Sequence, residues 1–192
     1  MLIFGYGAGY VIDSADLKNA EAVTGFKLGI QPDLDLTVCF GGGHPLTKGM
    51  EGQFFGSGGE AGFNKGVPGI YVNDPDAAPL ALFAKTQRIG AAVKKHDGWT
   101  GIYLGVMESA APQFLRNVAG LAGLHVYSTG GDVMYFNNSL IAIHASSDGL
   151  KTIELPVEAE VVSLWDDQDA GRLKTIRRQM KLGENALYRI GN

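Results

Sequence analysis

Apolar and polar positions alternate in short runs along most of this chain, a pattern that is typical of strands rather than of long helices. The runs predict strands near Met1–Phe4, Leu34–Phe40, Gly69–Val72, Leu80–Lys85, Gly90–Lys95 and Trp99–Val106. The turn residues Asp97-Gly98 separate the last two strands. We therefore expect Ala91–Lys95 and Thr100–Leu104 to form a hairpin.

Two segments instead carry apolar residues at helical spacing. Ser14 is expected to cap a short first helix, which Gly25 ends. Ser109 is expected to cap a second helix that has Pro112 in its first turn and ends at Gly123. The rest of the chain offers no comparable helical stripe.

From His125 onward the pattern predicts strands alone, separated by turns rich in glycine, asparagine and aspartate. The expected strands are His125–Ser128, Val133–Asn137, Leu140–Ala145, Lys151–Leu155, Glu160–Leu164, Leu173–Met180 and Ala186–Ile190. Pro156 marks the expected domain edge. This edge gives an α/β domain over residues 1–155 and a small β-rich segment over residues 156–192.

Glycine accounts for 28 of the 192 residues and gathers in a long connection over Gly41–Gly69. Connections of this length in compact domains are usually binding loops, lids or disordered segments. Phe54, Phe55 and Phe63 favour packing of this loop against the body of the domain. Disorder is the alternative.

Composition excludes several classes of partner. A net charge of −4 and a pI near 5.5 leave no basic field for a nucleic acid. The apolar runs are too short to span a membrane, and the N-terminus has no basic leader, so we expect a cytoplasmic protein. Cys39 is the single cysteine and the four histidines show no close pairing. We therefore expect neither a metal site nor a cofactor.

The first residues have the pattern of an interior strand. Met1–Phe4 is apolar and runs directly into the glycine-rich turn Gly5–Gly9. An interior strand needs a neighbour on each side, so we expect either further upstream sequence or a second chain to cover it. An exposed edge at Leu2–Phe4 predicts a homo-oligomer.

Several motifs together resemble one family. Three of these motifs lie between residues 71 and 128: YVNDPDA at 71–77, AVKKHDGWT at 92–100 and LRNVAGLAGLHVYS at 115–128. Four more lie between residues 132 and 190: DVMYFN at 132–137, LIAIHASSDG at 140–149, KTIELP at 151–156 and GENALYRI at 183–190. These segments resemble the C-terminal region of bacterial β-galactosidase-like glycoside hydrolases.

The resemblance implies an α/β fold and a carbohydrate context. In that family a catalytic β/α barrel precedes a flavodoxin-like domain, which is related to glutamine amidotransferases and often takes part in trimerisation, and a small β domain follows. The implied fold here is an incomplete flavodoxin-like (amidotransferase-like) sheet with β-hairpins and a small all-β tail. The implied partners are carbohydrate and either further copies of the chain or a missing catalytic domain.

The catalytic chemistry of that family has no counterpart in this sequence. Its two carboxylates lie on the barrel, and the turn Gly5–Gly9 has no cysteine or serine where an amidotransferase nucleophile would stand. We therefore expect a non-catalytic module that assembles subunits or borders a sugar site. The alternative is a compact stand-alone glycosidase that hydrolyses β-glycosides with a carboxylate pair of its own.

Each candidate site residue has a structural alternative. The carboxylates for such a pair would come from Glu51, Glu60, Asp97, Glu108 and Asp132, which as loop, turn and helix-start residues are also typical solvated charges. The candidate sugar-binding residues are Trp99 and Tyr103, which share one face of a strand, with His96 beside them and His44 at the start of the glycine-rich loop. The alternatives are that Trp99 anchors the core and His44 a turn.

Overall fold

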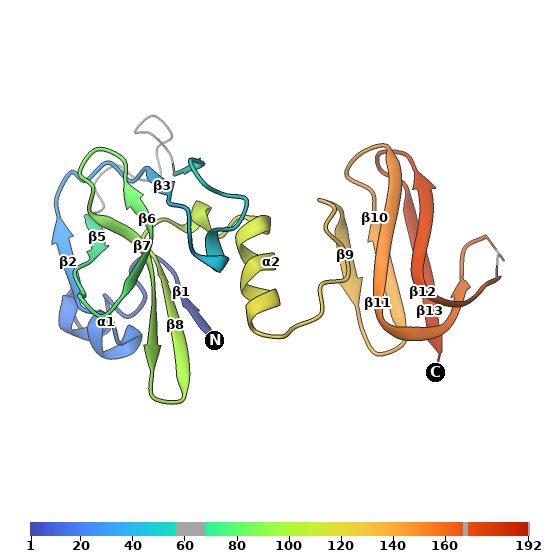
Figure 1. The fold of residues 1–192 in the computed structure, drawn as a ribbon, viewed down its shortest axis with the longest axis horizontal. Coiled ribbons are helices and arrows are strands. Elements are labelled where there is room, and N and C mark those ends of the chain that lie inside the picture. Colours follow the sequence, from blue (N-terminus) through green and yellow to red (C-terminus); the bar gives the residue numbers. More distant parts are fainter. Residues whose placement is uncertain (57–67, 167–168, 192) are drawn as a thin grey trace. The chain divides into compact units, whose positions relative to one another are not determined.

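The computed structural model describes residues 1–56, 68–166 and 169–191, so Glu60 and Phe63 lie outside the described residues. The chain divides into two compact units, Met1–Ala122 and Gly123–Asn192. This division comes before the predicted edge at Pro156, which lies inside a strand of the second unit. The fold is mixed α/β, with two sheets and few helices among the described residues (Figure 1).

The first unit is built on one sheet of short strands. They are β1 (Leu2–Phe4), β2 (Leu28–Gln31), β3 (Val38–Phe40), β4 (Phe54–Phe55), β5 (Gly69–Val72), β6 (Ala78–Phe83), β7 (Ile89–His96) and β8 (Trp99–Leu104). The order is β1-β8-β7-β6-β3-β4, and β2 joins through β5, which pairs with β7. Strand β1 runs parallel to β8, whereas the other described pairs of this sheet are antiparallel.

The predicted hairpin is confirmed. Strands β7 and β8 pair from Ala91 opposite Leu104 to His96 opposite Trp99, and Asp97-Gly98 forms the turn. Gly98 has a φ of 77°, a conformation that glycine adopts without a steric penalty.

Each face of the sheet packs against a helix. Helix α1 (Leu17–Thr24) lies on the face that includes Tyr103, where its Ala20 joins the same buried cluster. Helix α2 (Pro112–Leu121) packs on the opposite face through Phe114, which belongs to a cluster with Ile102 and Leu104. Successive side chains of β8 therefore enter two different cores, as the period of a strand requires.

The two predicted helix caps are wrong. The Asp16 carboxylate, not Ser14, caps α1 by accepting a hydrogen bond from the Lys18 N–H at 2.9 Å. Before α2 the chain forms a 3-10 turn, η2 (Met107–Ser109). The Ser109 hydroxyl is used inside that turn, where it donates to the Val106 carbonyl. The predicted end of α1 at Gly25 is correct, since this residue adopts the left-handed conformation with φ 74°.

A buried ion pair fastens three segments of the first unit. The Asp74 carboxylate, whose side chain is fully buried, accepts from Lys94 Nζ at 2.7 Å and from the Lys27 N–H at 3.0 Å. Burial by itself would raise the pKa of Asp74, but the contacts with Lys94 and with the backbone N–H groups of Lys27 and Asp76 outweigh burial and lower it. The pair therefore ties the β5–β6 turn to the start of β2 and to β7.

The second unit is a five-stranded antiparallel sheet. Its strands are β9 (Val133–Phe136), β10 (Leu140–His144), β11 (Gly149–Ser163), β12 (Asp169–Met180) and β13 (Asn185–Gly191), in the order β12-β11-β13-β10-β9. The two predicted strands on either side of Pro156 form the single strand β11. His125–Ser128 is not a strand, and the Tyr127 carbonyl there accepts from the Glu154 N–H at 2.7 Å.

Candidate functional site

A pocket of about 460 Å³ opens in the first unit where η1 (Pro45–Thr47), β7, β8 and α2 meet, and we name it the His44 pocket. Its polar lining consists of His44, Asp76, Lys95 and Thr100. Its apolar lining includes Leu46, Val93 and Leu121. Apolar walls with a few polar groups are typical of small-molecule sites.

His44 lines this pocket because the glycine-rich segment folds into η1. Its Nδ1 accepts a hydrogen bond from the Leu46 N–H at 3.1 Å, so the neutral ring carries its proton on Nε2 and can donate from that atom. Leu46 is fully buried in the core. The side chain of Asn117 on α2 donates to the carbonyls of Leu46 and Lys48, each at 3.0 Å. Helix α2 thus fixes η1, and through it the position of His44.

Lys95 and Thr100 reach the pocket from the hairpin, where they stand opposite each other. Asp76 comes from the β5–β6 turn, and its N–H donates to the Asp74 carboxylate at 3.1 Å. Within the described residues no salt bridge joins Asp76 to Lys95. One carboxylate, one ammonium, one imidazole and one hydroxyl therefore line the pocket, a set that can both donate to and accept from a polar ligand.

Three of the predicted sugar-binding residues lie on the other face of the sheet. The His96 ring stacks on the Trp99 ring with centroids 3.9 Å apart and planes within 9°, and Phe4 meets Trp99 edge to face at 6.0 Å. Tyr103 is fully buried beside Phe26. The sheet itself therefore separates these three residues from His44.

Two polar atoms on this face are buried without a hydrogen bond among the described residues, His96 Nε2 and the Tyr103 hydroxyl. Burial raises the pKa of the Tyr103 phenol. Tyr103 is thus a neutral core residue at physiological pH.

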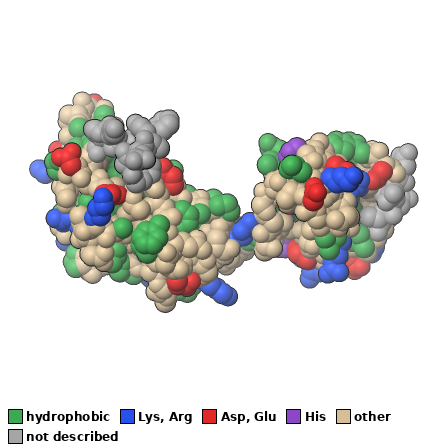
Figure 2. All heavy atoms as spheres, turned by 90° about the horizontal axis from the view of Figure 1, so that it is seen from above, with side chains coloured by type: hydrophobic (Ala, Val, Ile, Leu, Met, Phe, Trp, Pro, Cys, Tyr) green, Lys and Arg blue, Asp and Glu red, His purple; other side chains and the backbone are tan. Residues whose placement is uncertain are grey.

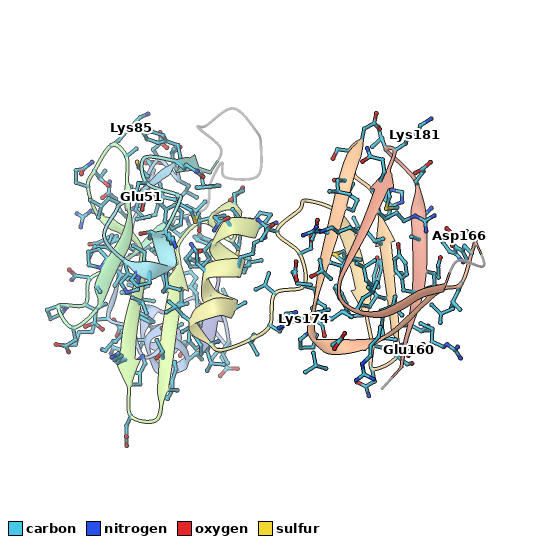
Figure 3. All side chains as sticks on the ribbon, turned by 45° about the vertical axis from the view of Figure 1, so that its right-hand side comes forward. Glu51, Lys85, Glu160, Asp166, Lys174 and Lys181 are labelled. Atoms are coloured by element: carbon cyan, nitrogen blue, oxygen red, sulfur yellow. The ribbon has the colours of Figure 1, made fainter. Side chains whose placement is uncertain are left out.

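The candidate carboxylates of the first unit lie on separate elements. Glu51 is exposed on the segment between β3 and β4 (Figure 3). Asp97 is exposed at the tip of the β7–β8 hairpin, and Glu108 is exposed in η2, beyond the other end of β8. The six residues of β8, at about 3.3 Å each, separate its two ends by roughly 16 Å. Glu60 lies outside the described residues.

Asp132 belongs to the second unit, where it is a buried ion-pair residue. Its carboxylate accepts from Lys151 Nζ at 2.8 Å and from the Ser146 N–H at 2.9 Å, and its side chain is 4% exposed. Burial alone would raise the pKa of Asp132, but Lys151 and Ser146 outweigh it and lower the pKa. Asp132 and Lys151 also line a polar pocket of about 400 Å³ together with Ser147.

Sequence reasoning missed the three other polar lining residues of the His44 pocket: Asp76, Lys95 and Thr100. The hairpin register contained a signal for two of them, because Lys95 and Thr100 must point away from the face that His96 and Trp99 share. Asp76 lines the pocket because segments far apart in the sequence pack together, and a local sequence pattern does not encode such packing.

Among the described residues no cluster of three or more His, Cys, Asp or Glu side chains has the arrangement of a metal site. Within that part of the chain, no helix has both the length and the apolar character that crossing a bilayer requires. Acidic and basic side chains are interspersed on the visible faces of both units (Figure 2).

No family model matches the chain, and no curated protein matches it either. Solved structures do. A β-galactosidase from Bacillus circulans sp. alkalophilus aligns with 98% of this chain at 9% identity and a TM-score of 0.63. A cold-adapted β-galactosidase from Rahnella sp. R3 aligns with 98% of this chain at 14% identity and a TM-score of 0.53. A GH42 β-galactosidase from G. stearothermophilus aligns with 100% of this chain at 9% identity and a TM-score of 0.61.

This chain spans 28–29% of the length of those three chains. At 9–14% identity the likeness concerns the fold. The chain, with its first unit followed by its second, therefore has the fold of a section of β-galactosidase chains.

Proposed function

We propose that this chain acts as a non-catalytic module of a carbohydrate-processing enzyme of the β-galactosidase kind, in which it borders a sugar site or joins subunits. The observation that carries the proposal is the alignment of 98–100% of the chain with only 28–29% of β-galactosidase chains. The fold shared with that section of β-galactosidase chains supports the module role.

The positions of the carboxylates support a non-catalytic role. Glycoside hydrolysis needs two carboxyl groups, roughly 5 Å apart for retention or roughly 6.5–9.5 Å apart for inversion. The described lining of the His44 pocket contains one carboxylate, Asp76. Asp97 and Glu108 lie at opposite ends of β8, and Asp132 is held by Lys151 in the other unit.

The His44 pocket has chemistry that suits a sugar. The His44 Nε2–H and the Lys95 ammonium can donate to sugar hydroxyl groups, and the Asp76 carboxylate can accept from them. Val93 and Leu121 can contact the apolar face of a sugar ring. These groups come from four different elements, so the pocket depends on the folded first unit.

We also propose that the sheet of the first unit descends from a flavodoxin-like, amidotransferase-like sheet. Three features support this proposal: the parallel pairing of β1 with β8, the turn Gly5–Gly9 after β1, and a helix on each face of the sheet. Assembly would use β1, which pairs on one side only among the described strands and exposes 52% of Leu2.

The sugar-bordering role is tested by titrating the ¹⁵N-labelled chain with methyl β-D-galactopyranoside and following its amide signals by NMR. We expect shifts at Lys95 and Thr100, and weaker binding in Lys95→Ala and Asp76→Asn. Lys18→Ala, an exposed charge on α1 at the other face, is the matched control and should bind as the parent does. Absence of shifts at these residues at high millimolar ligand would contradict the role.

A further inference from the structure

The second unit has a pocket of its own where β11 leaves its register. Glu154 pairs with Thr175 and Ala159 pairs with Leu173, so residues 155–158 of β11 stand opposite residue 174 alone. Pro156, which has no N–H to donate to a ladder, lies in this bulge. A pocket of about 260 Å³ opens beside it, and we name it the Tyr127 pocket.

Two asparagines at the β9–β10 turn give this pocket free amide groups. Asn137 Oδ1 accepts from the N–H groups of Ser139 at 2.9 Å and Leu140 at 2.7 Å, which orients the amide. Its NH₂ group has no hydrogen bond to any described residue, and the exposed Asn138 side chain has none either. An exposed amide that is oriented and not used by the protein can donate a hydrogen bond to a ligand hydroxyl.

The Tyr127 ring is held in place before any ligand arrives. It packs against Phe136 with centroids 4.2 Å apart and meets His125 edge to face at 4.7 Å. A ring nitrogen of His125, Nε2, in turn lies 2.7 Å from the Glu154 carbonyl oxygen. A fixed aromatic side chain with a polar tip loses little conformational entropy on binding.

The remaining lining is apolar and uncharged. Leu155, Val157 and Ile190 form part of the wall, and no charged side chain is found among the described lining residues. This composition differs from that of the His44 pocket, which has Asp76 and Lys95. The volume lies below the roughly 300–1,000 Å³ of drug-sized sites. The pocket therefore favours one small, neutral, hydrogen-bonding ring.

We infer that the Tyr127 pocket is a second sugar site, which binds a single neutral pyranose ring, either free or at the end of an oligosaccharide. The Asn137 and Asn138 amides and the Tyr127 hydroxyl contact the ring hydroxyls, and Val157 and Ile190 contact its apolar face. The choice of a sugar as ligand rests on the function proposed above, but the site lies in the other unit and responds separately.

The test is an NMR titration of the full ¹⁵N-labelled chain with methyl β-D-galactopyranoside and, in parallel, with galactobiose. We expect saturable shifts at the Tyr127 backbone and at the Asn137 and Asn138 side-chain amides. Asn138→Ala and Tyr127→Phe should each weaken this binding about fivefold, as the loss of one hydrogen bond implies. Tyr135→Phe, on the same sheet and 72% exposed, is the matched control and should leave it unchanged.

The outcomes separate the two sites. Shifts at the Tyr127 pocket that Tyr127→Phe or Asn138→Ala weakens support the inference, and tighter binding of galactobiose would assign the site to chain ends. No shift at these amides up to high millimolar ligand, or equal weakening by Tyr135→Phe, overturns it. Failure of the sugar-bordering role in the first unit is read from a different set of signals, those of Lys95 and Thr100.

Discussion

The imidazole of His96 lies flat on the indole of Trp99, with ring centroids 3.9 Å apart and planes 9° from parallel. Phe4 closes on the same indole edge to face at 6.0 Å. One face of Trp99, which sugar stacking would use, is thus occupied by His96. The pair joins the two strands of the β7–β8 hairpin beside its turn, where His96 and Trp99 stand opposite each other.

We predict a structural role for Trp99. Trp99→Ala should lower the free energy of unfolding of the first unit by about 1–2 kcal/mol, less than the roughly 3–5 kcal/mol for a fully buried tryptophan. Hydrogen exchange of the β8 amides measures the change. Trp165→Ala, at a residue that is 59% exposed in the second unit, should leave those amides unchanged. Equal exchange in the parent and Trp99→Ala would contradict the role.

The Asp74–Lys94 pair should make the first unit sensitive to acid. Because the folded-state pKa of Asp74 is lowered, the pair stabilises the fold above about pH 4, the unfolded value, and that stability is lost as pH falls through the folded pKa. Asp74→Asn should cost about 3 kcal/mol at pH 7, since it leaves Lys94 largely buried without its partner. Urea unfolding at pH 7 and pH 3 measures both quantities.

Asp35 provides the matched control for that experiment. It pairs with Lys85 at 2.7 Å, but the Lys85 side chain is 76% exposed. The hydrogen bond from Lys85 lowers the pKa of Asp35 too. Solvent screening limits such a pair to about 1 kcal/mol or less, so Asp35→Asn should be mild. A loss from Asp35→Asn as large as that from Asp74→Asn would refute the distinction between the two pairs.

Asn117 should affect ligand binding in the His44 pocket, although it does not line the pocket. Its amide holds η1 through the Leu46 and Lys48 carbonyls, so Asn117→Ala removes two hydrogen bonds and should cost about 1–3 kcal/mol. We expect galactoside binding at Lys95 to weaken as His44 loses its fixed position. Gln113→Ala removes only the 3.0 Å hydrogen bond to the Asn117 oxygen and should have a smaller effect. Unchanged binding in Asn117→Ala would argue against positioning by α2.

Strand β1 should mediate self-association. Met1, Leu2 and Ile3 are 44%, 52% and 40% exposed, and an apolar strand edge of this kind pairs with other chains. Light scattering should find an oligomer for the parent and a shift toward monomer for Leu2→Lys. Val11→Lys, at a residue that is 70% exposed and outside the strand, is the control. A strict monomer at high concentration would count against the prediction.

Local sequence signals predicted the elements whose ends are encoded by particular residues. Asp97-Gly98 gave the β7–β8 hairpin and Gly25 gave the end of α1. The sequence predicts two strands where the structure has the single strand β11, because proline usually ends a strand, whereas here a bulge accommodates Pro156. Strand β2 (Leu28–Gln31) was missed because four residues with one glycine carry too short a pattern.

The candidate site was predictable only in part. Periodicity assigned Trp99 and Tyr103 to one face, and both lie on that face, but it does not reveal which helix covers that face. Tyr103 lies in the α1 core, whereas His44 is brought to the opposite face by η1 and Asn117. Packing partners far apart in the sequence decide this division, and a single sequence does not encode them locally.

The most direct test of the non-catalytic role is hydrolysis of a panel of nitrophenyl glycosides by the purified chain. Glu51→Gln, Glu60→Gln, Asp76→Asn, Asp97→Asn, Glu108→Gln and Asp132→Asn variants are assayed beside it. We predict no turnover above background for the parent, and lower stability of the second unit as the main effect of Asp132→Asn, since it leaves Lys151 buried without its partner. Turnover that one or two of these substitutions abolish in a folded protein would contradict the account and identify a stand-alone glycosidase.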